Sequence, residues 1–286
     1  MNTAEFEFLS TLVHGKSGIV LTEDKAYLLT SRLNPVATQH GFASIDDMVA
    51  AMKSGRTSAR VVEDIVDAMT TNESYFFRDR KPFDGFEQDI LPYFVQARSA
   101  SRKLRIWCAA ASSGQEPYSL AILLKEAAPK LAGWRTDILG TDISSEILEK
   151  ARSGLYSQFE VQRGMPIQLL AKYFEKRGEM WQIDSALRAM VEYRRFNLLD
   201  RMVGLGAFDI VFCRNVLIYF DRETKADILA RISEQMAPDG VLVLGAAETV
   251  IGISTVFEPM QGQRGFFQRT DVPSQQQPQD AARLTA

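Results

Sequence analysis

Residues 104–126 read LRIWCAAASSGQEPYSLAILLKE, and this stretch decides the fold. Its first five residues are mostly apolar, as in a buried strand, while residues 116–126 have the apolar spacing of a helix. The turn between them consists of Ala, Ser, Gly and a single Gln. Small residues let a ligand approach the backbone, and the start of a helix offers unpaired N–H groups. An ordinary tight turn would look the same, and the G-x-G-x-x-G pattern of dinucleotide-binding proteins is absent.

The same alternation of strand and helix continues toward the C-terminus. We predict strands at residues 137–141, 207–213 and 241–246, and helices at residues 144–153 and about 222–236. Pro238-Asp239-Gly240 is predicted to form the turn before the last of these strands. Strands separated by helices of this length favour right-handed crossovers, so the pattern predicts a doubly wound α/β domain with a mostly parallel sheet.

One region fits this alternation poorly. Residues 156–182 are mixed in pattern, and residues 189–196 read as a strand. We therefore predict an inserted antiparallel β-subdomain at about 156–195, which leads back into the main sheet.

The segments that flank the α/β pattern differ from it in composition. Residues 1–70 show only helical periodicity, with Thr22 as a predicted N-cap, and are expected to form a small all-helical domain. Residues 71–103 follow as a linker, and the α/β domain occupies residues 104–271. Residues 272–286 are rich in Gln and Pro and are predicted to form a disordered tail.

Composition excludes several classes of protein. The 286 residues include 33 Lys and Arg against 36 Asp and Glu, a balance that argues against nucleic acid as the main partner. We find neither a signal peptide nor an apolar run long enough to span a bilayer, and expect a cytoplasmic protein without membrane insertion. The two cysteines, Cys108 and Cys213, exclude a disulfide framework and lack the spacing of a zinc site, so no metal is expected. The two histidines, His14 and His40, are predicted to be surface residues of the helical domain.

Asp142 ends the second predicted strand, in the sequence LGTDIS. An acid at this place in a βαβ unit can accept hydrogen bonds from ribose hydroxyls. It can equally be the N-cap of the helix that follows. Together with the small-residue turn, it favours a ligand that contains a nucleoside.

Six stretches together resemble the CheR family of chemotaxis receptor methyltransferases. They are TTNESYFFRD (70–79), RIWCAAASSGQEPYSLA (105–121), TDIS (141–144) followed by EILEKARSGLY (146–156), RFNLLD (195–200), FDIVFCRNVLIYFD (208–221) and MAPDGVLVLGAAET (236–249). The resemblance also covers the helical domain, so that it spans nearly everything except the tail. It implies a class I, Rossmann-like methyltransferase domain that uses S-adenosylmethionine, releases S-adenosylhomocysteine, and esterifies glutamate side chains of chemoreceptors.

The resemblance also implies the site residues. The positions that would contact the cofactor are Asn72, Ser74, Arg78, Glu116, Asp142, Asn197, Leu198, Arg214 and Asn215. Arg78 and Tyr219 would lie near the transferred methyl group as catalytic residues, and the linker would act as a lid over the cofactor. Taken singly, Tyr219 could be a core aromatic, Arg78 a surface salt-bridge partner and Asn197 a turn residue.

The implied partner is the cytoplasmic domain of a chemoreceptor, bound by a monomeric enzyme. In some family members a Gly-rich hairpin of the inserted subdomain binds a C-terminal pentapeptide of the receptor. The corresponding residues here, 176–183, are few and contain one glycine, so we expect methylation that does not depend on such a peptide. The helical domain would then dock the receptor, through Lys25 and Arg32 on one helix face and the basic residues of 53–60.

Two alternatives remain open at this point. One is a class I methyltransferase that acts on a small molecule, and the other is a non-catalytic module that binds S-adenosylhomocysteine and docks to receptors. An acceptor carboxylate has a pKa of about 4.3 and is already ionised near neutral pH, so the absence of a Ser/His or Cys/His pair is consistent with methyl esterification.

Overall fold

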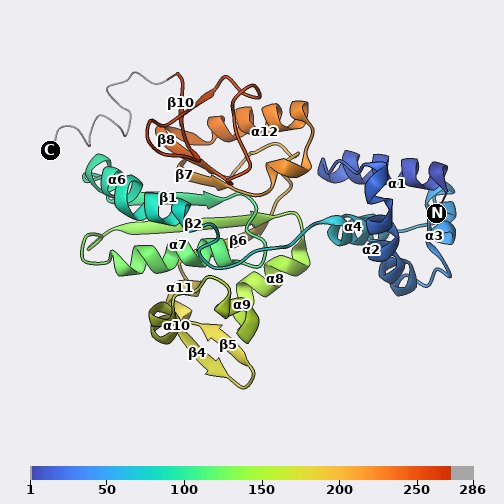
Figure 1. Cartoon of the computed structure of the whole chain (residues 1–286), viewed down its shortest axis with the longest axis horizontal. Helices are drawn as coiled ribbons and strands as arrows, with labels where there is room; N and C mark the ends of the chain where they lie inside the picture. The colour runs from blue at the N-terminus through green and yellow to red at the C-terminus, as the bar shows by residue number, and fades with distance from the viewer. Residues whose placement is uncertain (1, 272–286) are drawn as a thin grey trace.

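The computed structural model describes residues 2–271. Figure 1 shows a helical domain at the N-terminal end, a central domain built on a twisted sheet, and a small second sheet beside it. The tail that we predict to be disordered, residues 272–286, lies outside the described residues. No helix within residues 2–271 is both long and apolar enough to cross a membrane.

The N-terminal domain is all helical. It contains α1 (Thr3–Ser17), the 3-10 turn η1 (Glu23–Lys25), α2 (Ala26–Gln39), α3 (Ile45–Lys53) and α4 (Ala59–Met69). Apolar side chains one helical turn apart, such as Leu29 and Leu33, are fully buried in a core of its own. The side chains of Asn2 and Ser44 accept hydrogen bonds from the first turns of α1 and α3 and so fix where these helices begin.

Two predictions for this domain are wrong. Thr22 precedes only the short turn η1, and its side chain makes no capping hydrogen bond. Lys25 lies in η1 and not on the helix that carries Arg32, because the chain tightens to 3-10 geometry there. Arg32 donates hydrogen bonds to the carbonyl oxygens of Met69 (3.0 Å) and Thr70 (2.9 Å), and its charge is therefore used to cap the end of α4.

Both histidines bind carboxylates. His14 is half-exposed, and its Nε2 lies 2.9 Å from Asp221 Oδ2 in the central domain. The side chain of His40 is only 18% exposed and lies 2.8 Å from Asp64 Oδ2. His40 is therefore a partly buried residue and not the surface residue that we predict from the sequence.

The linker contains helices that the sequence did not lead us to predict. They are α5 (Lys81–Gly85), the π-helical turn η2 (Phe86–Ile90) and α6 (Leu91–Ala97). Their apolar residues recur every three or four positions and are buried in the core of the central domain; these are Phe83, Phe86, Ile90 and Phe94. The linker is therefore part of the main fold.

The main sheet has seven strands in the order β6-β2-β1-β7-β8-β10-β9. The strands are β1 (Lys103–Cys108), β2 (Arg135–Asp142), β6 (Val191–Arg195), β7 (Phe208–Cys213), β8 (Met236–Leu244), β9 (Phe257–Pro259) and β10 (Phe266–Arg269). The first five in spatial order pair in parallel, and β10 and β9 add an antiparallel edge. This arrangement confirms the predicted α/β fold.

Two hydrophobic layers cover the two faces of this sheet. Side chains alternate along each strand, so that Ile106 packs into one layer and its neighbour Trp107 into the other. The first layer includes the linker helices and α7 (Gln115–Glu126), and the second includes α12 (Arg222–Glu234). A further helix, α8 (Ser145–Ser153), follows β2.

The inserted subdomain is a three-stranded antiparallel sheet in the order β3-β5-β4. Its elements are β3 (Leu155–Ser157), α9 (Gln158–Gln162), α10 (Ile167–Tyr173), β4 (Phe174–Arg177), β5 (Met180–Ile183) and α11 (Ser185–Arg188). A turn of two residues, 178–179, joins β4 to β5.

Two strand assignments differ from the prediction. The strand that we place at the end of the subdomain, β6, pairs in parallel with β2 and belongs to the main sheet, because its alternate residues Val191 and Tyr193 are buried against that sheet. The predicted turn at 238–240 lies inside β8, where the register with β7 shifts between Phe208 and Ile210. The turn residues form a bulge there, and the strand continues on both sides of it.

Candidate active site

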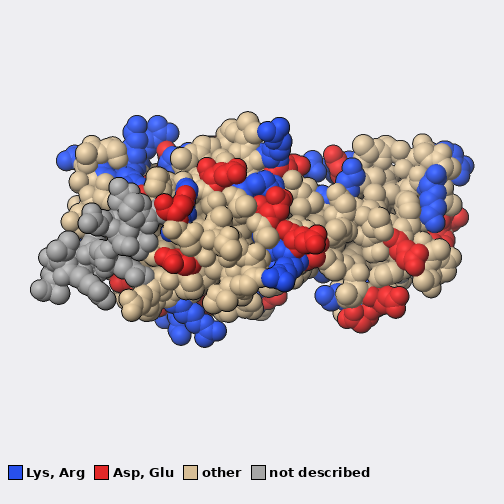
Figure 2. Space-filling view, turned by 90° about the horizontal axis from the view of Figure 1, so that it is seen from above, with Lys and Arg blue, Asp and Glu red and all other residues tan. Residues whose placement is uncertain are grey.

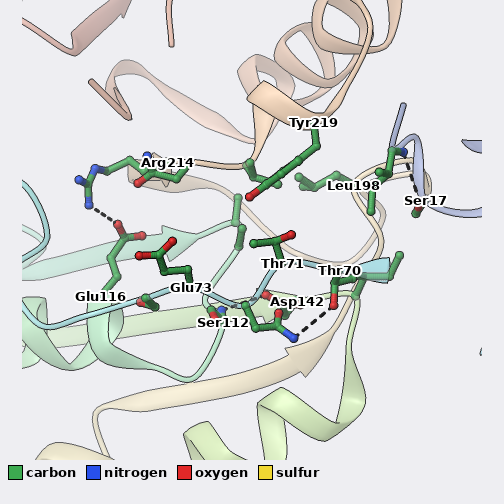
Figure 3. A pocket seen from close by; sticks show the side chains of 18 of the residues that line it. Ser17, Thr70, Thr71, Glu73, Ser112, Glu116, Asp142, Leu198, Arg214 and Tyr219 are labelled. Atoms are coloured by element: carbon green, nitrogen blue, oxygen red, sulfur yellow. Dashed lines mark hydrogen bonds and ion pairs between the residues drawn. The ribbon is translucent and has the colours of Figure 1, made fainter. Parts of the chain in front are cut away.

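A pocket lies at the carboxyl ends of β1, β2 and β7, and the empty space in and in front of it amounts to about 890 Å3, open solvent included. Because these strands are parallel and adjacent, the loops that follow them meet at one edge of the sheet. The linker segment 70–78, the loop after β6 and the end of α1 complete its walls. Figure 3 shows labelled residues from these segments arranged around one space.

The ten residues that we predict for the site all line this pocket. They are Asn72, Ser74, Arg78, Glu116, Asp142, Asn197, Leu198, Arg214, Asn215 and Tyr219. The structure therefore brings together positions that are spread over about half of the sequence. Their individual roles toward a ligand stay predictions.

Asp142 shapes the turn that follows β1. Its carboxylate accepts hydrogen bonds from the backbone N–H groups of Ser112 (2.9 Å) and Ser144 (3.1 Å). Burial raises the pKa of Asp142, and these backbone donors act in the opposite direction. The N-cap of α8 is Ser144, whose hydroxyl accepts from the Ile147 N–H, so the alternative reading of Asp142 as that cap is wrong.

The turn itself has a backbone conformation that suits small residues. Ser112 has a φ of 49° and Gly114 a φ of 91°. A Cβ atom at Gly114 would lie 2.6 Å from the Tyr193 hydroxyl and 3.0 Å from the Ala151 Cβ, so only glycine fits. The chain can therefore turn tightly over the end of β1 and leave the pocket open above it.

Arg214 is almost fully buried, with its side chain 1% exposed, and makes three hydrogen bonds. Nη1 donates to Glu116 Oε2 (2.7 Å), and Nη2 donates to Asp79 Oδ2 (2.9 Å) and to the Arg78 carbonyl oxygen (2.9 Å). Burial raises the pKa of Glu116, and the nearby guanidinium of Arg214 works against that rise. Figure 3 shows Arg214 and Glu116 joined at one end of the pocket. The Arg214 side chain thus connects the start of α7 with the linker.

Arg78 lies in a short segment of unusual backbone. Its neighbours Phe77, Asp79 and Arg80 have φ values of 51°, 68° and 49°, which are costly for residues with a Cβ. Arg78 Nη1 donates to the Glu73 carbonyl oxygen at 2.7 Å. Within residues 2–271 it forms no salt bridge, which contradicts the surface salt-bridge reading and leaves its charge available to a ligand.

Tyr219 lines the same pocket from the 3-10 turn η3 (Leu217–Tyr219). It is partly exposed, and Figure 3 shows its hydroxyl pointing into the pocket, which contradicts the reading of a core aromatic. Asn197 both lines the pocket and forms a turn, because its Oδ1 accepts from the Leu199 N–H at 3.0 Å.

Several residues important to the site were missed in the sequence. Glu248 accepts hydrogen bonds from the backbone N–H groups of Asn215 (2.7 Å), Val216 (2.9 Å), Ile218 (3.3 Å) and Gly245 (2.8 Å), and so fixes the loop before Tyr219. Glu248 lies in the stretch MAPDGVLVLGAAET (236–249), but its position there gives no sign that it binds the loop after β7. Ser17 and Ile19 of the helical domain also line the pocket. Nothing local in the sequence connects them with a site that lies more than 50 residues further along the chain.

The sheet order and the pocket above its carboxyl edge define a Rossmann-like α/β domain with a ligand site at the carboxyl ends of its strands. Residues 72–266 match the "CheR methyltransferase, SAM binding domain", and residues 4–70 match the "CheR methyltransferase, all-alpha domain". The chain belongs to the CheR methyltransferase family. It is a methyltransferase of the chemotaxis type, and its cofactor is S-adenosylmethionine.

Relatives are similar over nearly their whole length. Chemotaxis protein methyltransferase 1 of Pseudomonas aeruginosa is 41% identical over 270 residues, which cover 93% of this chain and 97% of the relative. Chemotaxis protein methyltransferase Cher2 of Pseudomonas putida is 39% identical, over 92% of this chain and 96% of the relative. The chemotaxis protein methyltransferase of Salmonella typhimurium is 33% identical, over 92% and 89%.

The pocket fits this cofactor chemically. Asp142 offers a buried carboxylate at the strand end, where ribose hydroxyls can donate to it. The side chains of Ile143, Leu198 and Val216 give apolar contacts suited to a flat base. Glu116 is a second buried acid on the lining and can receive a cationic amino group.

Proposed function

We propose that this enzyme methylates glutamate side chains of chemoreceptors and so forms glutamate methyl esters for sensory adaptation. The observation that carries the proposal is the pair of Arg78 and Tyr219 on the lining of one pocket, with the guanidinium free of salt bridges to residues 2–271 and the phenol directed inward. A cation and a phenol that line the same pocket suit a carboxylate acceptor better than a neutral one.

The proposed reaction needs no general base. S-adenosylmethionine, when bound, supplies a methyl group on a positively charged sulfur. A glutamate carboxylate is ionised near neutral pH, so its oxygen can form the new C–O bond as the C–S bond breaks, without loss of a proton. The two charges cancel, leaving a neutral ester and a neutral thioether.

The residues then act by binding and orientation. The cofactor would be held by Asn72, Ser74, Arg78, Glu116, Asp142, Asn197, Leu198, Arg214 and Asn215. Arg78 would hold the acceptor carboxylate, and the Tyr219 hydroxyl would direct one oxygen along the line of attack. Alignment and exclusion of water can contribute several kcal/mol to such a transfer. A very tight grip on the carboxylate would stabilise the ground state, so we expect positioning to matter more than affinity.

A transfer assay tests this proposal. The full-length enzyme, radiolabelled S-adenosylmethionine and the cytoplasmic domain of a chemoreceptor should give label on the receptor that alkali releases as methanol. A receptor with Gln at the methylated positions is the control and should stay unlabelled. Binding of S-adenosylhomocysteine without transfer would support a non-catalytic module, while label in small molecules alone would support the other alternative.

We further propose that methylation does not require a C-terminal receptor pentapeptide. The turn between β4 and β5 is two residues long, which is too short to frame a peptide beside the exposed strand β4. Micromolar binding of a free pentapeptide in a titration calorimeter would contradict this.

The helical domain would contribute to docking with fewer cations than we expected. Arg32 is committed to the end of α4, and Arg60 lies 2.9 Å from Asp64. The Lys53 Nζ lies over the Phe8 ring, 5.1 Å from its centroid. Figure 2 shows basic and acidic side chains interspersed on the face in view. We propose weak docking by a monomer in the cytoplasm, with methylation rates that fall as ionic strength rises.

A further inference from the structure

The Tyr219 side chain is not held by hydrogen bonds of its own within residues 2–271. It belongs to η3, a single 3-10 turn, and short turns of this kind have poor internal hydrogen-bond geometry. The ring packs against the hydrophobic layer that includes α12, so the position of the phenol depends on this packing and on what fixes the backbone of residues 219–221.

Glu248 holds the backbone before Tyr219, and the first turn of α12 holds Asp221 after it. The helical domain adds contacts to Tyr219 and Asp221 themselves. The Val20 N–H donates to the Tyr219 carbonyl oxygen at 2.9 Å. Two residues later, Asp221 Oδ2 lies 2.9 Å from His14 Nε2. These contacts cross between segments about 200 residues apart in sequence, and both come from the last turn of α1 and the residues just after it.

Two further contacts join the end of α1 to the central domain beside η3. Asn197 Nδ2 donates to the Lys16 carbonyl oxygen at 2.7 Å, which ties the end of α1 to the loop after β6. Gly18 packs directly on the loop that follows Tyr219, since a Cβ atom there would lie 3.0 Å from Phe220 Cδ1 and 3.1 Å from Leu199 Cδ2. Residues 14–20 therefore pack against η3 and against the loop after β6.

Gly18 is required at this place for two physical reasons. It ends α1 in the left-handed region with a φ of 76°, which residues with a Cβ adopt at a cost. Glycine is also the only residue small enough here, because the Phe220 ring occupies the space next to its Cα. A methyl group would have to push the Phe220 ring by a few tenths of an ångström, and Phe220 is the residue next to Tyr219.

We propose that residues 14–20 position Tyr219 for methyl transfer, with Gly18 as the positioning residue. The inference rests on the proposed function, in which Tyr219 acts on the acceptor. The helical domain is then one wall of the active site as well as a docking module, because residues just after α1 contact the backbone that carries the phenol.

Gly18→Ala tests this proposal, and Gly41→Ala is its matched control. Gly41 lies in the same domain with nearly the same φ, 77°, but a Cβ there would meet nothing within 4 Å. Both variants place a Cβ on a backbone with nearly the same positive φ, and only Gly18→Ala pushes on Phe220. We expect kcat for receptor methylation to fall about ten-fold in Gly18→Ala, since a 1 Å misplacement can cost about 100-fold. Gly41→Ala should keep the wild-type kcat per folded molecule.

The same substitution in a Tyr219→Phe background separates positioning from general damage. If Gly18 acts through the phenol, Gly18→Ala should add little to the loss that Tyr219→Phe already causes. An equal further loss in that background, or an equal loss in Gly41→Ala, would overturn the proposal. His14→Ala, which strains no backbone, should lower kcat in the same direction if Gly18→Ala fails to fold.

Amide hydrogen exchange tests the positioning inference without measuring activity, so that its failure can be told apart from failure of the proposed function. The Val20 amide should exchange slowly with solvent in the wild type and markedly faster in Gly18→Ala, but not in Gly41→Ala. If the wild-type enzyme transfers no methyl group, the proposed function fails whatever the exchange shows. If it transfers methyl and the Val20 amide is unprotected, the positioning inference fails alone.

Discussion

Replacement of Arg214 by Met should destabilise the protein strongly, and more so at high pH. The substitution keeps the length of the side chain but leaves the Glu116 carboxylate buried without its partner. Removing one partner of a buried ion pair costs about 3–5 kcal/mol. For a chain of this size that corresponds to a melting temperature lower by about 6–20 °C. Asp79 loses the same partner, but it is 34% exposed and can be solvated by water instead.

The pH dependence follows from the raised pKa of Glu116. Burial already raises this pKa in the presence of Arg214, and loss of the guanidinium raises it further. A folded carboxyl group with a raised pKa binds a proton that the unfolded chain has released, so stability falls as pH rises above the unfolded value. Arg214→Met should therefore lose more stability relative to wild type at pH 8 than at pH 5.

Thermal melts followed by circular dichroism at both pH values provide the assay. The control is Arg135→Met, which removes a 72% exposed arginine and should cost at most about 1 kcal/mol. The double variant Glu116→Gln/Arg214→Met lacks the orphaned charge and should be more stable than Arg214→Met alone at pH 8. Equal losses at pH 5 and pH 8, or a double variant less stable than the single one, would refute the argument.

Three further changes test other parts of the site and its support. Asp142→Ala should weaken S-adenosylhomocysteine binding about 10–150-fold, equivalent to about 1.5–3 kcal/mol. An affinity equal to that of wild type in a titration calorimeter would contradict this. Arg78→Ala should lower kcat about 100-fold and leave the melting temperature near that of wild type, because the guanidinium has no salt bridge within residues 2–271; normal methylation by a folded variant would exclude its role. Burial raises the pKa of Asp67 from 3.8 to about 6, so the Asp67 carboxyl lowers the stability of the wild type as pH rises from about 4 to 6. Asp67→Asn lacks this contribution, so its stability relative to wild type should increase over that range in thermal melts, and a constant difference would contradict the argument.

Much of the fold follows from local sequence. The strand, small-residue turn and helix at 104–126 are set by side-chain size and apolar period, and the structure places β1 at Lys103–Cys108 and α7 at Gln115–Glu126. The position of Asp142 at the end of β2 also follows, because the carboxyl ends of adjacent parallel strands meet at one edge.

Errors arose where a segment's role depends on distant partners. The strand pattern around Val191 is clear in the sequence, but pairing with β2 decided that it joins the main sheet. Phe83 and Phe86 have helical spacing within the linker, yet only the core that they enter explains why that linker is helical.

The sequence by itself determined which residue types stand at the strand ends and which segments form helices and strands, because these depend on neighbours within a few positions. Tertiary structure alone decided how the groups are used. Arg214 bonds Glu116, 98 residues away, and His14 meets Asp221 at a separation of 207 residues. Such contacts have no local signal, since their energies arise only when burial removes water from both partners and the folded chain holds them within hydrogen-bonding distance.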